Sequence, residues 1–131
     1  MNKEAGQGLV EYALVLPVFL LITFGIMEFG FLFLQYSTIA NAAREGARTG
    51  ILPVTQACNQ ACVDGRARAA ALALTTGLDP AGLTVDVSHP QPNTVRVAVS
   101  YDASLMTGPV IQAVGGGGTI SLQSTATMNR E

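Results

Sequence analysis

The apolar residues of this chain are concentrated in one long run near the start of the sequence. Residues 12–27 carry no charged side chain, and residues 29–34 continue the run after Glu28. As an α-helix at about 1.5 Å per residue, residues 12–34 are roughly 34 Å long, enough to cross a hydrocarbon core of about 30 Å. The pattern therefore predicts a membrane-spanning helix.

Two other interpretations of this run are weaker. A buried core helix needs surrounding apolar mass, and the rest of the chain has too little of it. A secretory signal has a shorter apolar run with a small-residue cleavage site close behind it. Ala40-Asn41-Ala42 lies well past the end of this run. We therefore keep the membrane interpretation.

The sequence beyond the apolar run predicts two helices. The sequence after the apolar run stays compatible with a helix through Arg48, so the first helix would extend from about residue 8 to residue 49 and be about 63 Å long. Ile51-Leu52-Pro53 ends it, and the spacing of Gly46 and Gly50 permits close packing or marks the helix end. A second helix is expected over residues 59–76, with one apolar face made of Val63, Ala67, Ala70 and Leu74.

Three segments alternate apolar and polar residues with the period of a β-strand. They are residues 83–88, 94–101 and 120–128, separated by a turn at 89–93 and by a longer Gly-rich link. These segments predict a three-stranded antiparallel meander packed on the helices. The expected fold class is α+β, with a long N-terminal helix continuing into a small domain.

Composition and charge exclude several classes of function. The chain has 131 residues, seven Lys and Arg against nine Asp and Glu, one His, two Cys and a mean hydropathy of +0.38. No basic cluster marks a nucleic-acid interface, so nucleic acid is not an expected partner. One His, predicted in the surface turn as His89, and two Cys leave little material for a metal site or a catalytic triad. We expect a protein that is not an enzyme and has no metal or cofactor.

Cys58 and Cys62 are expected to form a small structural disulfide, with free thiols as the alternative. In a regular helix, Cβ atoms four residues apart are about 5–6 Å from each other, whereas a disulfide needs about 3.8 Å. A bridge therefore requires a loop or a distorted first turn before Val63. A disulfide suits an oxidising compartment, which places the domain outside the cytoplasm and the N-terminus inside.

A helix that serves only as a membrane anchor does not need several of the polar or helix-breaking residues found here. Glu11 opens the apolar run and Glu28 interrupts it. Each is either an interfacial residue, at the membrane edge or near the outer headgroups, or is neutralised by another subunit or a new N-terminal amine. Pro17 predicts a kink or a loosened turn, which is either simply tolerated or useful for packing and extraction. Arg44 and Arg48 form either a solvated stripe or a subunit contact.

Four segments of the chain carry a resemblance to a known family. Gly6-Gln7-Gly8-Leu9-Val10-Glu11-Tyr12, followed by the hydrophobic helix, resembles a class III prepilin processing site, in which Glu is the fifth residue of the mature chain. The blocks at residues 11–17, 24–30 and 41–48 resemble successive blocks of the TadE-like family. Its members are pilin-like components of tight-adherence (Tad/Flp) pilus systems. The resemblance covers roughly residues 6–50.

The resemblance implies a processed precursor. A membrane-embedded prepilin peptidase would cut between Gly6 and Gln7, which makes residues 1–6 a leader, 7–50 a helix for membrane and filament core, and 51–131 an extracytoplasmic domain. Glu11 would neutralise the new amine of a neighbouring subunit, because two buried opposite charges cost less together than apart. Gly8 departs from the pattern by offering a second cleavage position, although the position of Glu11 favours Gly6.

The implied function is that of a structural pilin-like subunit. Its partners would be other pilin-like subunits, the prepilin peptidase, the inner-membrane assembly platform and, before assembly, membrane lipid. Glu11, Tyr12, Pro17, Glu28, Arg44 and Arg48 would be the assembly residues. It would move from the cytoplasmic membrane to an extracellular or periplasmic filament with a role in adhesion, and the chain length favours a minor subunit. The alternative is a single-pass anchor whose outer domain binds a ligand and which is neither processed nor polymerised.

Overall fold

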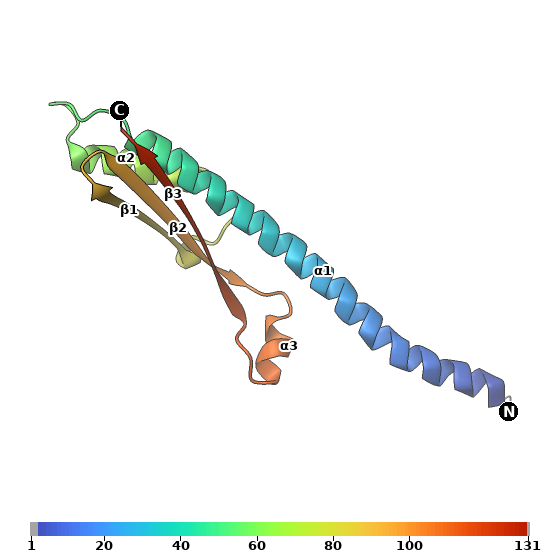
Figure 1. Cartoon of the computed structure of the whole chain (residues 1–131). Coiled ribbons are helices and arrows are strands. Elements are labelled where there is room, and N and C mark those ends of the chain that lie inside the picture. The colour runs from blue at the N-terminus through green and yellow to red at the C-terminus, as the bar shows by residue number, and fades with distance from the viewer. Residues whose placement is uncertain (1–2, 131) are drawn as a thin grey trace.

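A single long helix forms the spine of the molecule (Figure 1). The computed structural model describes residues 3–130, with side chains from Gln7 onward, so Met1 and Asn2 of the predicted leader lie outside the described residues. Helix α1 runs over Lys3–Gly50, 48 residues or about 72 Å, and extends beyond the predicted segment at both ends. It continues without interruption through Pro17, and Figure 1 shows a gentle bend in its N-terminal part.

One face of the C-terminal third of α1 is built into the domain core. Its buried positions recur every three or four residues, which is the helical period, and they are Gln35, Ile39, Ala42, Ala43, Gly46, Ala47 and Gly50. By contrast, every side chain from residue 7 to residue 22 is exposed. The last third of the helix is therefore a core element, and the part before it is an exposed apolar rod.

Helix α2 (Gln60–Ala73) packs against α1 through small residues. The Asn59 side chain accepts a hydrogen bond from the Cys62 N–H and caps the helix start. The buried residues are Val63, Ala67 and Ala71, whereas Leu74 is 47% exposed. The predicted face was therefore correct at Val63 and Ala67. Ala71 is buried where Ala70, which is only partly buried, was predicted, and Leu74 was wrong because α2 ends before it.

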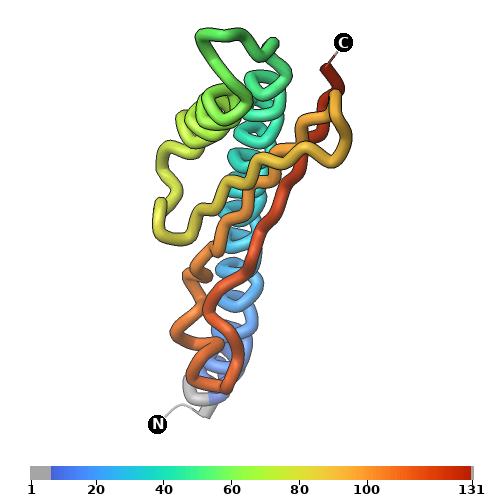
Figure 2. Tube along the Cα trace, turned by 90° about the vertical axis from the view of Figure 1, so that its left-hand side faces the viewer, coloured from blue at the N-terminus to red at the C-terminus, as the bar shows by residue number. Residues whose placement is uncertain are grey.

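The sheet is an antiparallel meander in the order β1-β2-β3, as predicted. Its strands are β1 (Leu83–Gln91), β2 (Thr94–Ser104) and β3 (Thr119–Asn129). The central strand β2 buries every second side chain, namely Val95, Val97, Val99, Tyr101 and Ala103, in the core that it shares with α1 and Ala71 of α2. Helix α1 packs on β2 and β3, and α2 packs on β1, so both helices contact the sheet (Figure 2).

Two connections differ from the predictions. Strand β1 continues through His89 and Pro90, with a register irregularity between Ser88 and Gln91, so the turn is only Pro92-Asn93. Placing His89 in a turn was therefore wrong. The Gly-rich link between β2 and β3 contains a short helix, α3 (Gly108–Ala113), and a 3₁₀ turn, η1 (Pro80–Gly82), precedes β1. Neither was predicted.

Candidate functional site

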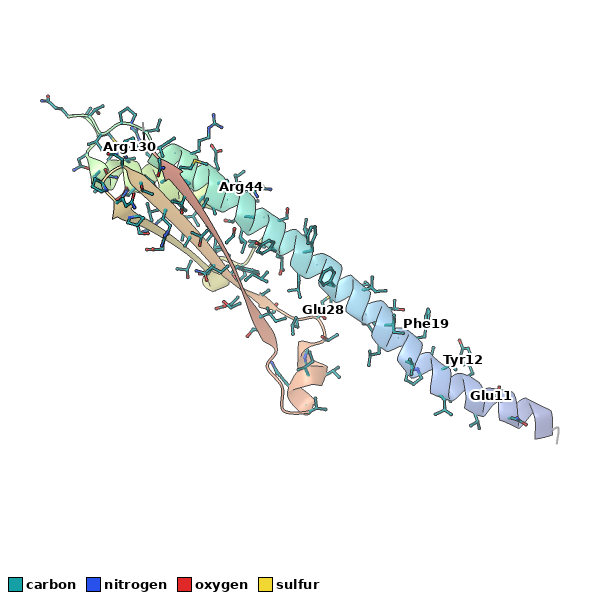
Figure 3. All side chains as sticks on the ribbon, in the orientation of Figure 1. Glu11, Tyr12, Phe19, Glu28, Arg44 and Arg130 are labelled. Carbon is teal, nitrogen blue, oxygen red and sulfur yellow. A yellow bond between two sulfur atoms is a disulfide. The ribbon has the colours of Figure 1, made fainter. Side chains whose placement is uncertain are left out.

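The N-terminal part of α1 is a large apolar surface that no other part of the described chain covers. Phe19 is 62% exposed and Phe29 is 71% exposed, and the neighbouring Leu, Ile and Val side chains point outward around the helix (Figure 3). Among the helices of the described residues, α1 is the one that is long and apolar enough to cross a membrane, judged by length and composition. A patch of this size indicates contact with lipid or with other protein.

The residues of the predicted processing site lie at the free end of this rod. Gly6, Gln7 and Gly8 are all within the helical backbone. The side chains of Gln7, Glu11 and Tyr12 are exposed, Tyr12 at 66%, and Figure 3 places Glu11 and Tyr12 far from the domain. Among the side chains described from Gln7 onward, none is hydrogen-bonded to Glu11. A partner for this carboxylate has to come from outside the described part of the chain.

Glu28 has its partner within the same chain. The backbone N–H of Met106 donates to Oε1 at 2.7 Å. The N–H and the hydroxyl of Thr107 donate to Oε2 at 3.0 and 2.8 Å. Both carboxylate oxygens are therefore engaged by the loop that leads into α3. We call these three hydrogen bonds the Glu28 clamp. Neither interpretation drawn from the sequence named this loop.

Next to the clamp, an open apolar groove of about 710 Å³ lies between α1 and the α3 region. One wall is α1, with Phe24, Gly25 and Leu32 around Glu28 and with Pro17 at the far end. The other wall includes Val110 and Ile111 of α3. Pro17 removes one backbone hydrogen bond from this wall of the groove, because it has no N–H.

Comparison with known proteins finds one match, and it falls on α1. Residues 6–48 match the family model for TadE-like protein. This segment is TadE-like. No curated protein and no solved structure matches the chain. The match covers the blocks on which the resemblance rested, and it indicates a Tad pilus-associated protein with an N-terminal apolar helix.

The TadE-like segment also contains Arg44 and Arg48, which lie on the solvent side of α1. Both are exposed, and Arg48 Nη1 is 3.7 Å from Glu45 Oε2 one turn away. An exposed pair of this kind contributes little to stability, since water screens it. Both side chains are accessible to another protein, and Figure 3 shows Arg44 pointing away from the domain. Their role in assembly stays a prediction.

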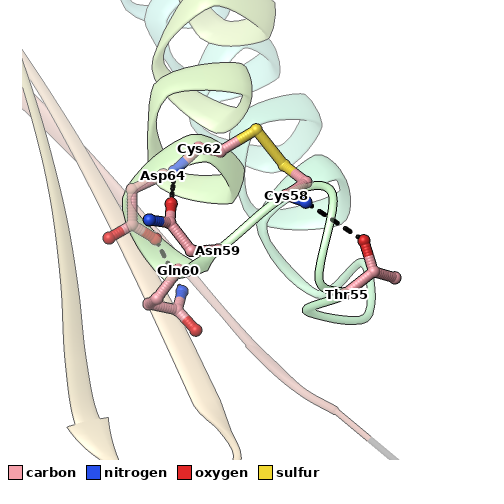
Figure 4. Close-up of a disulfide and its surroundings, with 6 residues drawn as sticks. All are labelled: Thr55, Cys58, Asn59, Gln60, Cys62 and Asp64. Atoms are coloured by element: carbon pink, nitrogen blue, oxygen red, sulfur yellow. Dashed lines mark hydrogen bonds between the residues drawn. A yellow bond between two sulfur atoms is a disulfide. The ribbon is translucent and has the colours of Figure 1, made fainter.

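The disulfide lies outside the TadE-like segment. Cys58 and Cys62 are bridged, with an S–S distance of 2.03 Å and Cα atoms 5.3 Å apart (Figure 4). Cys58 precedes the Asn59 cap and sits in a small loop in which Cys58 and Thr55 exchange two backbone hydrogen bonds. The distortion required before Val63 is thus a loop that ends at the helix cap. The bridge ties this loop to the first turn of α2.

A second polar cluster, which the sequence did not predict, ties α2 to β1. His89 Nε2 lies 3.0 Å from Asp64 Oδ1, and the Gln60 amide donates to the same oxygen at 2.8 Å. The three side chains are partly exposed and include no nucleophile. Among the described residues, no three His, Cys, Asp or Glu side chains are grouped so as to hold a metal ion. The cluster is best understood as a structural tie between two elements.

Proposed function

We propose that this chain is a structural pilin-like subunit, a pilin or a minor pseudopilin, of a Tad/Flp-type pilus. The observation that carries the proposal is the exposed apolar rod of α1, which lies within the TadE-like segment. The chain enters the cytoplasmic membrane as a precursor with its N-terminus inside. A prepilin peptidase cuts after Gly6, and the mature subunit is assembled through its N-terminal helix. It performs no catalysis.

The energetics of α1 support assembly after extraction from the membrane. A helix that is apolar on every side is stable in lipid but not in water. When the subunit leaves the bilayer, only other apolar helices can replace the lipid around residues 7–34. Glu11 has no partner among the described side chains from Gln7 onward. Its carboxylate would then accept a hydrogen bond from the new, protonated amine of Gln7 in a neighbouring subunit.

The remainder of the chain fits an extracytoplasmic position. Residues 51–130 form, with the C-terminal third of α1, a domain whose disulfide suits an oxidising compartment. The assembly platform of the inner membrane would act on the anchored precursor. Arg44, Arg48 and Tyr12, all exposed on α1, are available for contacts between subunits.

The competing function is an anchored binding domain that is neither processed nor polymerised. It requires no cleavage after Gly6 and no role for Glu11. The groove beside α1 is the feature that favours it, because an apolar groove can hold a ligand. Proteolytic processing separates the two functions.

The test is the intact mass of the full chain expressed with and without a prepilin peptidase. We expect a peptidase-dependent loss equal to residues 1–6, which Gly6→Leu abolishes. The matched control is Gly8→Leu, which leaves the loss unchanged. A chain that stays intact in every case would refute processing and leave the anchored domain ahead.

Assembly is tested with Glu11→Gln in cells that carry the complete pilus system. We expect this variant to be cleaved normally but to be missing from the sheared filament fraction, because its side chain no longer neutralises an amine. Glu45→Gln, which alters a carboxylate farther along the same helix, is the control and should assemble. Normal assembly of Glu11→Gln would contradict the proposed pairing.

A further inference from the structure

The segment that bears α3 is held beside the apolar run of α1 rather than beside the core. We define the tip as residues 105–118, which comprise α3 and its flanking loops. The Glu28 clamp attaches Met106 and Thr107 to α1 at position 28. In Figure 1 the tip lies at the end of the sheet, alongside the part of α1 that the core does not cover.

Position 28 lies inside the apolar run and not at its end. On the domain side of Glu28, residues 29–34 include three Phe and two Leu, and Phe33 and Leu34 are 64% and 61% exposed. A hydrocarbon core of about 30 Å takes about 20 residues of helix. Counted from Glu11, such a span ends near residue 31, so Glu28 would lie about 5 Å within it. The tip is therefore level with the bilayer leaflet on the domain's side.

The tip has the side chains of a surface that contacts lipid. Residues 103–129 carry no charged side chain, although charged residues flank them at Asp102 and Arg130. Met106, Val110 and Val114 are 63%, 70% and 84% exposed. Apolar side chains this exposed, with no charge near them in the sequence, are unfavourable in water.

Most N–H groups of the tip also have an acceptor within the protein, as a medium without water requires. In lipid, a backbone N–H without an acceptor costs several kcal/mol. Met106 and Thr107 donate to Glu28, and Leu105 donates to the Gly118 carbonyl at 2.9 Å. Six more residues of the tip donate to carbonyls within it, at 2.9–3.2 Å: Gly108, Val110, Ile111, Val114, Gly115 and Gly116. Pro109, at the start of α3, has no N–H to satisfy.

We propose that the tip is a second membrane contact of this protein, which inserts among the lipid acyl chains of the leaflet on the domain's side while α1 spans the bilayer. Lipid also fills the groove between α1 and α3. The Glu28 clamp serves both partners, because it satisfies a carboxylate in the apolar run and two N–H groups of the inserted loop. The inference goes beyond the proposed function and rests on it only in that α1 must be in the membrane.

The test uses tryptophan as a depth probe, because the chain contains none. Val110→Trp and Val114→Trp place the probe on the tip, at exposed positions that leave the core intact. Phe19→Trp places it on α1 within the run, and Val54→Trp, at a 45% exposed residue in the loop after α1, is the matched aqueous control. Each full-chain variant is reconstituted in vesicles of phosphatidylethanolamine and phosphatidylglycerol, with and without acyl-chain-brominated lipid.

We expect the two tip variants to emit at shorter wavelength than Val54→Trp and to be protected from quenching by acrylamide. We also expect their emission to be quenched by lipids brominated near the headgroups. Tip probes that acrylamide reaches as readily as Val54→Trp would overturn the inference. So would blue-shifted emission that bromine does not quench, because a second copy of the protein would then cover the groove. If Phe19→Trp itself is not quenched, α1 is not inserted, and the proposed function fails together with the inference.

Discussion

One added methyl group at Gly46 tests how α1 is built into the domain. A Cβ at this position would lie 3.1 Å from the Ala67 carbonyl oxygen, from Ala71 Cβ and from Val97 Cγ1. The matched control is Gly65 on the exposed side of α2, where a Cβ meets nothing within 4 Å. Both glycines are in α-helices, so the two substitutions differ in packing and not in local conformation.

The expected free energies of unfolding follow from these contacts. Gly→Ala in a helix stabilises by about 1 kcal/mol through propensity alone, so Gly65→Ala should raise stability by that amount. At Gly46 the same gain is opposed by overpacking of about 1–3 kcal/mol, since Ala67, Ala71 and Val97 are fully buried and cannot move outward. We expect Gly46→Ala to lower stability by about 1 kcal/mol, or roughly 4–8 °C in Tm.

The assay is thermal unfolding of the full chain in detergent micelles, followed by near-ultraviolet circular dichroism, to which Tyr101 contributes as the buried one of the three tyrosines. This side chain is 6% exposed and reports on the core, whereas the apolar part of α1 stays helical in the micelle and would mask a far-ultraviolet signal. A Gly46→Ala protein as stable as Gly65→Ala would refute the reasoning, because it would mean that α1 and α2 separate at no cost.

Three further results are expected. Replacing both Cys58 and Cys62 by Ser should cost about 2 kcal/mol in urea unfolding, the value for a loop with a sequence separation of 4, and reductant should then have no further effect. Gln35→Met should leave stability unchanged or raise it, because the buried Gln35 Oε1 has no hydrogen-bond partner among the described residues; a clear loss would point to an acceptor role in the folded protein. Glu28→Ala should speed amide hydrogen exchange at Met106 and Thr107, and Glu45→Ala should not; equal rates in both would contradict the clamp.

Much of the fold could be predicted because its signals are local. The charge-free run predicted the exposed part of α1, and the alternation of Val95, Val97 and Val99 predicted a buried central strand. The spacing of Gly46 and Gly50 indicated either close packing or the helix end; close packing occurs against Ala67 of α2 and Val95 of β2, and α1 also ends at Gly50. In each case the period of the side chains decides which face can be buried, and that period is visible in a short window of sequence.

The missed features have two physical causes. Helix α3 has six residues and begins at Gly108-Pro109, so it is too short to show a helical period. The extension of β1 past Pro90 depends on pairing with β2, which outweighs the local preference of proline for a turn. The face of α2 shifted from Ala70 to Ala71 because α1 and β1 decide which side of that helix is covered.

The sequence by itself determined that this protein has an apolar helical rod, a small α+β domain and, through its TadE-like blocks, a place among pilus-associated proteins. Only the tertiary structure decided what Glu28 does. Its hydrogen-bond donors, Met106 and Thr107, lie 78 and 79 residues after Glu28 in the sequence, so no local pattern connects them to a membrane helix. The meander brings them together because β2 packs along the face of α1 that carries Glu28 and delivers the chain to it beyond the core. A carboxylate in apolar surroundings is stable only where such donors meet it.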